Sequence, residues 1–141
     1  MYRCLIFFSV GLWFASCGPK KPDNAAYIIS VAVEPQPATA KSNPEQRFER
    51  DTVIAPSVVE AYNKGVQKYA AVLMHIQQFP DSIAGVGKLQ IFDEKGQEIV
   101  SSIPQEQRDS VIMNFIQFAR RSTIPYYDRV KDFELKLMTA R

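Results

Sequence analysis

The stretch SVVEAYNKGVQKYAAVLMHIQQFP, residues 57–80, carries the clearest structural signal in this 141-residue chain. Its apolar residues recur at alternating spacings of three and four, the period of one face of an α-helix. They are Val59, Tyr62, Val66, Tyr69, Leu73 and Ile76. Ser57 and Glu60 form an S-x-x-E capping box at the start, and Pro80 ends the pattern. We therefore expect a long amphipathic helix, weakened by about 1 kcal/mol where Gly65 replaces a better helix former.

After this helix, two short apolar runs lie on either side of a turn. Residues 86–92 and 97–101 flank Asp93-Glu94-Lys95-Gly96, and a Gly near the end of a four-residue loop is typical of a type I turn closed by a left-handed residue. The pattern predicts a β-hairpin with Leu89 and Ile91 on one face. Because two strands alone are marginal in water, the hairpin needs helices on one face, a third strand, or both.

Two more helices are expected in the last third of the chain. Ser102 and Pro104 open the first, and Arg120 and Arg121 suit its C-terminal end, where cations interact favourably with the helix dipole. Its stripe comprises Ile112, Phe115 and Ala119, widened by Val111, Ile116 and Phe118. The second follows Pro125 and is lined by Tyr126, Val130, Phe133 and Leu137.

Residues 17–56 have the composition of a tether that leads into a folded module at 57–141. Five prolines lie between residues 18 and 55, and residues 36–51 are polar. Residues 27–33 differ, because Tyr27, Ile29, Val31 and Val33 alternate with their neighbours at the period of a β-strand. We expect this strand to dock onto the module. The predicted fold class is α+β, with three helices packed on a small antiparallel sheet made of the hairpin and this N-terminal strand.

The first sixteen residues have the three-part plan of an export signal. Arg3 supplies a positive charge, residues 5–14 are mostly apolar, and Ala15 and Ser16 are the small residues that a signal peptidase requires. The apolar run is too short for a transmembrane helix, which needs about 20 apolar residues.

Ala15, Ser16 and Cys17 together resemble the lipobox of bacterial lipoproteins, a resemblance that covers about the first eighteen residues. It implies that Cys17 takes the lipid through a thioether, that residues 1–16 are removed, and that the protein is anchored in the bacterial cell envelope. Phe14 stands where the family usually has an aliphatic residue. Gly18, in place of the Asp that favours retention in the inner membrane, favours the outer membrane. The alternatives are a secreted protein with an incidental Cys and an uncleaved anchor.

The charge and cysteine content are consistent with an exported protein. The chain has 17 Lys and Arg against 15 Asp and Glu, a net charge of +2, and no basic stripe of the kind that nucleic-acid binding requires. Cys4 would leave with the signal, so the mature chain would hold no disulfide pair and would depend on its hydrophobic core.

No catalytic, metal or cofactor site is expected from the sequence. His75 is the single histidine and has no accompanying G-x-S-x-G nucleophile motif, and no second His or Cys completes a zinc site. Asp128 and Asp132 are four apart, so on a helix they would share a face. They indicate a solvated helix face with ion pairs, or the carboxylate pair of a cell-wall hydrolase.

Tyr126 and Tyr127 are the candidate partner contacts. Adjacent residues on a helix cannot both point into the core, so one ring is expected to be exposed, and an exposed Tyr is a credible interface anchor. The predicted function is a lipid-anchored envelope protein of non-enzymatic type that contacts the membrane through Cys17 and another protein through a helix surface. The alternatives are the carboxylate hydrolase and a module that binds an apolar ligand between helices and sheet.

Overall fold

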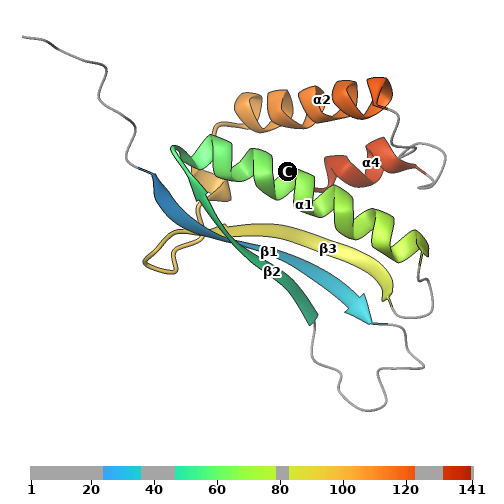
Figure 1. The fold of residues 1–141 in the computed structure, drawn as a ribbon, viewed down its shortest axis with the longest axis horizontal. Helices are drawn as coiled ribbons and strands as arrows, with labels where there is room; N and C mark the ends of the chain where they lie inside the picture. Colours follow the sequence, from blue (N-terminus) through green and yellow to red (C-terminus); the bar gives the residue numbers. More distant parts are fainter. Residues whose placement is uncertain (1–23, 36–46, 79–82, 123–131, 141) are drawn as a thin grey trace, which may run out of the picture.

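A computed structural model describes residues 24–35, 47–78, 83–122 and 132–140, and it has the expected α+β class (Figure 1). The elements are β1 (Ala25–Pro35), β2 (Arg47–Ala55), α1 (Val58–Gln78), β3 (Ile83–Phe92), the short 3₁₀ helix η1 (Val100–Ser102), α2 (Gln105–Arg121) and α4 (Phe133–Met138). The three strands form one antiparallel sheet in the order β2-β1-β3. All three helices lie on the same side of this sheet.

The predicted strand at 27–33 is confirmed and is the central strand of the sheet. Tyr27, Ile29, Val31 and Val33 are all buried on the face of β1 that α1 covers. Ile29 pairs with Ile91 and Val31 with Leu89, so the large aliphatic residues of β1 and β3 meet on that face. β1 therefore contributes the middle of the core.

Helix α1 lies between the sheet and the other two helices (Figure 1). The Ser57 hydroxyl accepts a hydrogen bond from the Glu60 N–H at 3.1 Å, which confirms the N-terminal cap. The expected stripe is confirmed as well, since Tyr62, Val66, Tyr69 and Leu73 are buried.

Gly65 lies where α1 comes closest to β3. A Cβ atom at this position would lie 3.0 Å from Ile91 Cδ1 and 3.3 Å from Leu89 Cδ2. The glycine that weakens the helix as an isolated segment thus allows the helix to approach the sheet closely.

Helices α2 and α4 both pack on α1. α2 buries Ile112, Phe115, Ile116 and Ala119, and Pro104 precedes its first turn as predicted. α4 is fastened by two tyrosines of α1. The Tyr62 hydroxyl donates to the Ala140 carbonyl oxygen at 3.2 Å, and the Tyr69 and Thr139 hydroxyls are 2.7 Å apart.

The predicted second strand of the hairpin, residues 97–101, is wrong. After the turn the chain makes one isolated bridge, between Phe92 and Glu98, and then enters η1. The Asp93 carboxylate accepts the Gln97 N–H at 2.8 Å, and the Glu98 carboxylate accepts the Val100 N–H at 2.9 Å. These side-chain bonds bend the backbone away from the ladder, and the bend buries Val100 in the core.

The interpretation of the whole of residues 36–51 as a polar tether is also wrong, because β2 begins at Arg47. β2 is an edge strand that pairs with β1 from Ala25 opposite Ala55 to Val33 opposite Arg47. Its residues on the α1 side include Glu49 and Asp51, which pair with Val31 and Ile29. Their charges remove the apolar alternation that would have marked a strand.

The last helix is shorter than expected. α4 spans Phe133–Met138, and Asp132 before it has a left-handed backbone with φ 56. A residue in this conformation cannot continue a right-handed helix, so no single helix runs through Asp132. Residues 126–131 of the predicted helix lie outside the described part of the chain.

Candidate functional site

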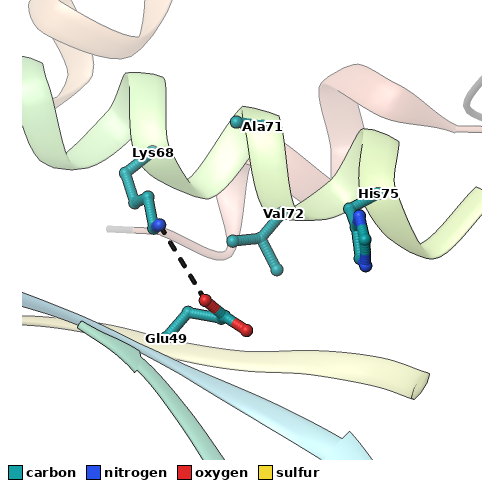
Figure 2. A pocket seen from close by; sticks show the side chains of 5 residues that line it. All are labelled: Glu49, Lys68, Ala71, Val72 and His75. Carbon is teal, nitrogen blue, oxygen red and sulfur yellow. Dashed lines mark ion pairs between the residues drawn. The ribbon is translucent and has the colours of Figure 1, made fainter. Parts of the chain in front are cut away.

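A small cavity lies between α1 and the edge strand β2 (Figure 2). It measures about 200 Å³ and is lined by Glu49, Lys68, Ala71, Val72 and His75. Lys68, Val72 and His75 extend from successive turns of α1 towards the sheet, and Glu49 rises from β2 to meet them.

The charged groups at this cavity form ion pairs with one another. Lys68 Nζ is 2.9 Å from an Asp51 carboxylate oxygen and 4.0 Å from a Glu49 oxygen. The ammonium group thereby pairs with Asp51 and offsets part of the negative charge of the two acids that β2 directs towards α1. His75 is exposed, and none of the five lining residues is a Ser, Thr or Cys that a histidine could activate. The cavity gives no support for a catalytic role of His75.

A second cavity, of about 260 Å³, lies between α1, β3 and α4 and is lined mostly by apolar residues. The lining comprises Tyr69, Leu73, Ile76, Gly85, Val86, Lys136 and Thr139. Burial raises the pKa of Tyr69, and the hydrogen bond with Thr139 lowers it to a smaller extent. The phenol therefore stays protonated at neutral pH, as its role in holding α4 requires. The cavity is smaller than the roughly 300–1,000 Å³ usual for ligand pockets.

Most residues singled out from the sequence cannot be compared with this geometry. Cys17, Tyr126, Tyr127 and Asp128 lie outside the described residues. Asp132 is described, is exposed, and accepts the Lys136 N–H through its backbone carbonyl at 2.9 Å. Because its backbone is left-handed, the expectation that Asp128 and Asp132 share one face of a continuous helix is wrong.

The face of the sheet away from α1, hereafter the outer sheet face, was not recognised from the sequence because β2 was not. It consists of Ala26, Ile28, Ser30, Ala32 and Glu34 of β1, Phe48, Arg50, Thr52 and Ile54 of β2, and Lys88, Gln90 and Phe92 of β3. Three large apolar residues are exposed here: Ile54 (63%), Ile28 (41%) and Phe48 (39%). Among the described residues no helix covers this face (Figure 1).

The helices on the opposite side also expose large apolar residues. Phe118 of α2 is 56% exposed and Leu135 of α4 is 71% exposed, while Met113 of α2 is exposed to a lesser degree. An ion pair from Arg120 Nε to Glu134, at 2.9 Å, links the two helices. The exposed apolar residues on this side are hereafter the helical face (Met113, Phe118 and Leu135).

Neither a metal-binding cluster nor a membrane-spanning helix is found among the described residues. They contain no cluster of three or more His, Cys, Asp or Glu residues that could hold a metal ion. None of the described helices combines the length and the apolar character needed to cross a membrane.

Comparison with protein-family models, with curated proteins and with solved structures finds no match for this chain.

Proposed function

We propose that this chain is a bacterial lipoprotein, held in the cell envelope by lipid on Cys17, with the outer membrane favoured, and that its α+β domain binds another protein and catalyses no reaction. The anchor is argued from the export-signal pattern of residues 1–16 and from the lipobox-like run Ala15, Ser16 and Cys17.

The observation that carries the proposal is the export-signal pattern that ends in the lipobox-like run Ala15, Ser16 and Cys17. The described elements, from Ala25 of β1 onward, and the described buried core, from Tyr27 onward, all follow the predicted cleavage site in the sequence.

The cysteine content supports the same conclusion. Without Cys4, Cys17 is the only thiol of the mature chain. A free thiol in an oxidising compartment is reactive, and a thioether to lipid caps it. One acyl chain gives only marginal membrane binding, with a constant of about 10⁴ M⁻¹, whereas the two or three chains of a lipoprotein hold stably.

The binding role is argued from what the domain exposes. The described cavities contain an ion pair and a tyrosine that holds α4, and neither provides a nucleophile with its base. By contrast, Phe118 and Leu135 place large apolar surface in solvent on the helical face. Tyr126 and Tyr127, the predicted partner contacts, lie in sequence between α2 and α4, the two helices that form this face.

The anchor is tested by intact-mass analysis and fractionation of the protein from bacterial membranes. We expect a mature species that begins at residue 17 and carries added hydrocarbon. Cys17→Ser should abolish the lipid and the anchored mature form, whereas the matched variant Cys4→Ser should leave both unchanged. A mature species that begins elsewhere, or that begins at residue 17 without lipid, would contradict the anchor.

The partner is tested by photo-crosslinking in intact cells. A photoreactive amino acid at position 118 or 127 should give one discrete adduct, of the same partner mass at both positions, and Leu135→Ser should reduce its yield. Position 88, an exposed residue of β3 on the outer sheet face, serves as the control and should not give this adduct. Equal adducts at all three positions, or none at 118 and 127, count against the binding role.

A further inference from the structure

We infer that one end of the outer sheet face, formed by Ile28, Ile54 and Phe92, rests on the lipid surface to which the chain is anchored. The inference rests on the proposed acylation of Cys17 and adds a second contact with the bilayer, made by folded side chains. We call these three residues the anchor-side patch.

The strand register groups the three residues at one end of the sheet. Ile54 of β2 pairs with Ala26, near the first residue of β1, and Ile28 pairs with Phe92 of β3. Ile54 has the largest exposed fraction of the three, Ile28 is exposed, and Phe92 is half-buried. Their side chains project from the same face of neighbouring strands, so apolar surface gathers where the chain enters the fold.

The point of entry is held in place by side chains from elsewhere in the fold. The Ala26 N–H donates to a Glu94 carboxylate oxygen at 3.1 Å, and Lys64 Nζ donates to the Ile54 carbonyl oxygen at 2.7 Å. The first residues of β1 and the last residues of β2 are therefore fixed relative to α1 and to the turn after β3.

The chain between the anchor and this point is short. Ala25 lies eight residue steps after Cys17 (25 − 17), a span of at most roughly 26–29 Å when fully extended. As flexible chain it would have a root-mean-square length of about 14–17 Å. The anchor-side patch is the part of the outer sheet face that this connection keeps closest to the bilayer.

The far end of the same face provides an internal comparison. Phe48 pairs with Ala32, six residues along β1 from the Ala26 that pairs with Ile54. At about 3.3 Å per residue, the two positions are separated by roughly 20 Å. Phe48 is also engaged by Arg50, whose guanidinium carbon lies 5.1 Å from its ring centroid. Phe48 and Ile54 thus share a strand and a face and differ in their distance from the anchor.

The charges around the short connection suit anionic headgroups. Residues 18–24 contain Lys20, Lys21 and Asp23, a net charge of +1 (2 − 1). At the point of entry, the Lys64 ammonium at the Ile54 carbonyl oxygen and the Glu94 carboxylate at the Ala26 N–H balance each other. The basic pair Lys20 and Lys21 therefore supplies the net positive charge next to the apolar patch, a composition found on surfaces that lie in the headgroup region of a membrane.

The test measures lipid contact at the two ends of the outer sheet face. Ile54→Cys and Phe48→Cys are each purified in the lipidated form and labelled with an environment-sensitive fluorophore. Because the thioether blocks Cys17 and Cys4 is removed, the introduced thiol is the single labelling site. The proteins are placed in vesicles of phosphatidylethanolamine and phosphatidylglycerol that contain a spin-labelled lipid quencher. We expect blue-shifted emission and several-fold stronger quenching at position 54 than at position 48.

The other outcomes separate this inference from the anchor itself. Vesicle-bound protein with no quenching at 54, or with equal quenching at both positions, overturns the inference and leaves the anchor standing. Labelling of Cys17 itself, seen as a second fluorophore by mass, contradicts the anchor and the inference together. A fluorophore at position 54 that is shielded from water in native membranes, and yet is not quenched by the spin-labelled lipid, would mean that another protein covers the position. This result would also overturn the inference.

Discussion

The two faces of the sheet are built from the same three strands but differ in the size and exposure of their residues. On the α1 side, β1 presents Tyr27, Ile29, Val31 and Val33, all buried. On the outer side the central strand presents mostly small residues, and the exposed large apolar residues are Ile28 of this strand and Phe48 and Ile54 of β2. The neighbours Ile28 and Ile29 show the contrast most directly, since the first is 41% exposed and the second fully buried. The inner face accounts for the stability of the fold, and the outer face is available for contacts with other molecules.

The largest expected effect comes from truncation on the inner face. Ile29→Ala should lower the free energy of unfolding by about 2–5 kcal/mol, because it removes buried methyl groups and leaves a cavity between β1 and α1. Ile28→Ala is the matched control and should cost less, about 1 kcal/mol or below, because Ile28 is already 41% exposed. Denaturant unfolding of both variants measures the difference. Equal losses would show that the two faces are energetically alike.

The close approach of α1 to the sheet can be tested from the helix side. Gly65→Val should destabilise the domain by about 1–3 kcal/mol, because its side chain would collide with Ile91 and Leu89, both fully buried. Gln67→Val, at an exposed position of the same helix, serves as the control and should cost only a few tenths of a kcal/mol in helix propensity. Thermal unfolding distinguishes the two, and a stable Gly65→Val would mean that the inner face has spare room.

The comparison can be extended to α4, which is attached to α1 through a hydrogen bond of Tyr69. Tyr69→Phe removes the hydrogen bond to Thr139 and should cost about 0.5–1.5 kcal/mol at neutral pH. Burial raises the folded-state pKa of Tyr69 above its ordinary value of 10.0. The contribution of the protonated phenol is therefore complete below about pH 10 and is lost as the pH rises through the folded pKa.

Unfolding measured from pH 8 to 12 should show a smaller loss of stability in alkali for Tyr69→Phe than for the unmodified protein. Identical pH profiles for the two proteins would exclude this role for the phenol.

The smallest effect is expected at the edge of the inner face. Lys68→Met removes the ion pairs with Asp51 and Glu49, which are partly exposed, and should cost about 0.2–1 kcal/mol. Added salt should reduce the difference. Lys88→Met, on the outer sheet face, is the control and should leave stability nearly unchanged. A loss above about 2 kcal/mol for Lys68→Met would mean that β2 depends on this pair far more than a surface ion pair allows.

The sequence predicts the fold well where one physical signal dominates. Apolar periodicity predicts the buried stripe of α1, the alternation of β1, and the position of Leu89 and Ile91 on one face of β3. The structure confirms all three. β2 escapes detection because Glu49 and Asp51 occupy its inward positions, and only Lys68, 17 residues after Asp51, accounts for them. The bend at Asp93 and Glu98 depends on hydrogen bonds between side chains and backbone, which hydrophobic patterns do not report.

Less of the candidate site could be predicted. The lipidation of Cys17 is predicted from local sequence because the lipobox is a contiguous motif. The outer sheet face could not be predicted from local sequence, because it forms only when residues from three strands are brought into register. No periodicity in residues 47–55 indicates that Ile54 lies on the same face and at the same end of the sheet as Ile28 and Phe92. Cys17, Tyr126 and Tyr127 remain predictions, because they lie outside the described residues.

The central position of β1 has a consequence for a chain that is made from its N-terminus and, as proposed above, exported. β1 leaves the ribosome early but has neighbours on both sides, and β3 becomes available only some fifty residues later (83 − 35 = 48). The core closes later still, since Leu137 and Ala140 are fully buried near the other end of the fold. A nascent chain can pair β1 with β2 early, but it cannot complete the sheet until β3 is made, or close the core until nearly the whole sequence has been synthesised. For the export proposed above, this late completion of the fold would favour passage of an unfolded chain.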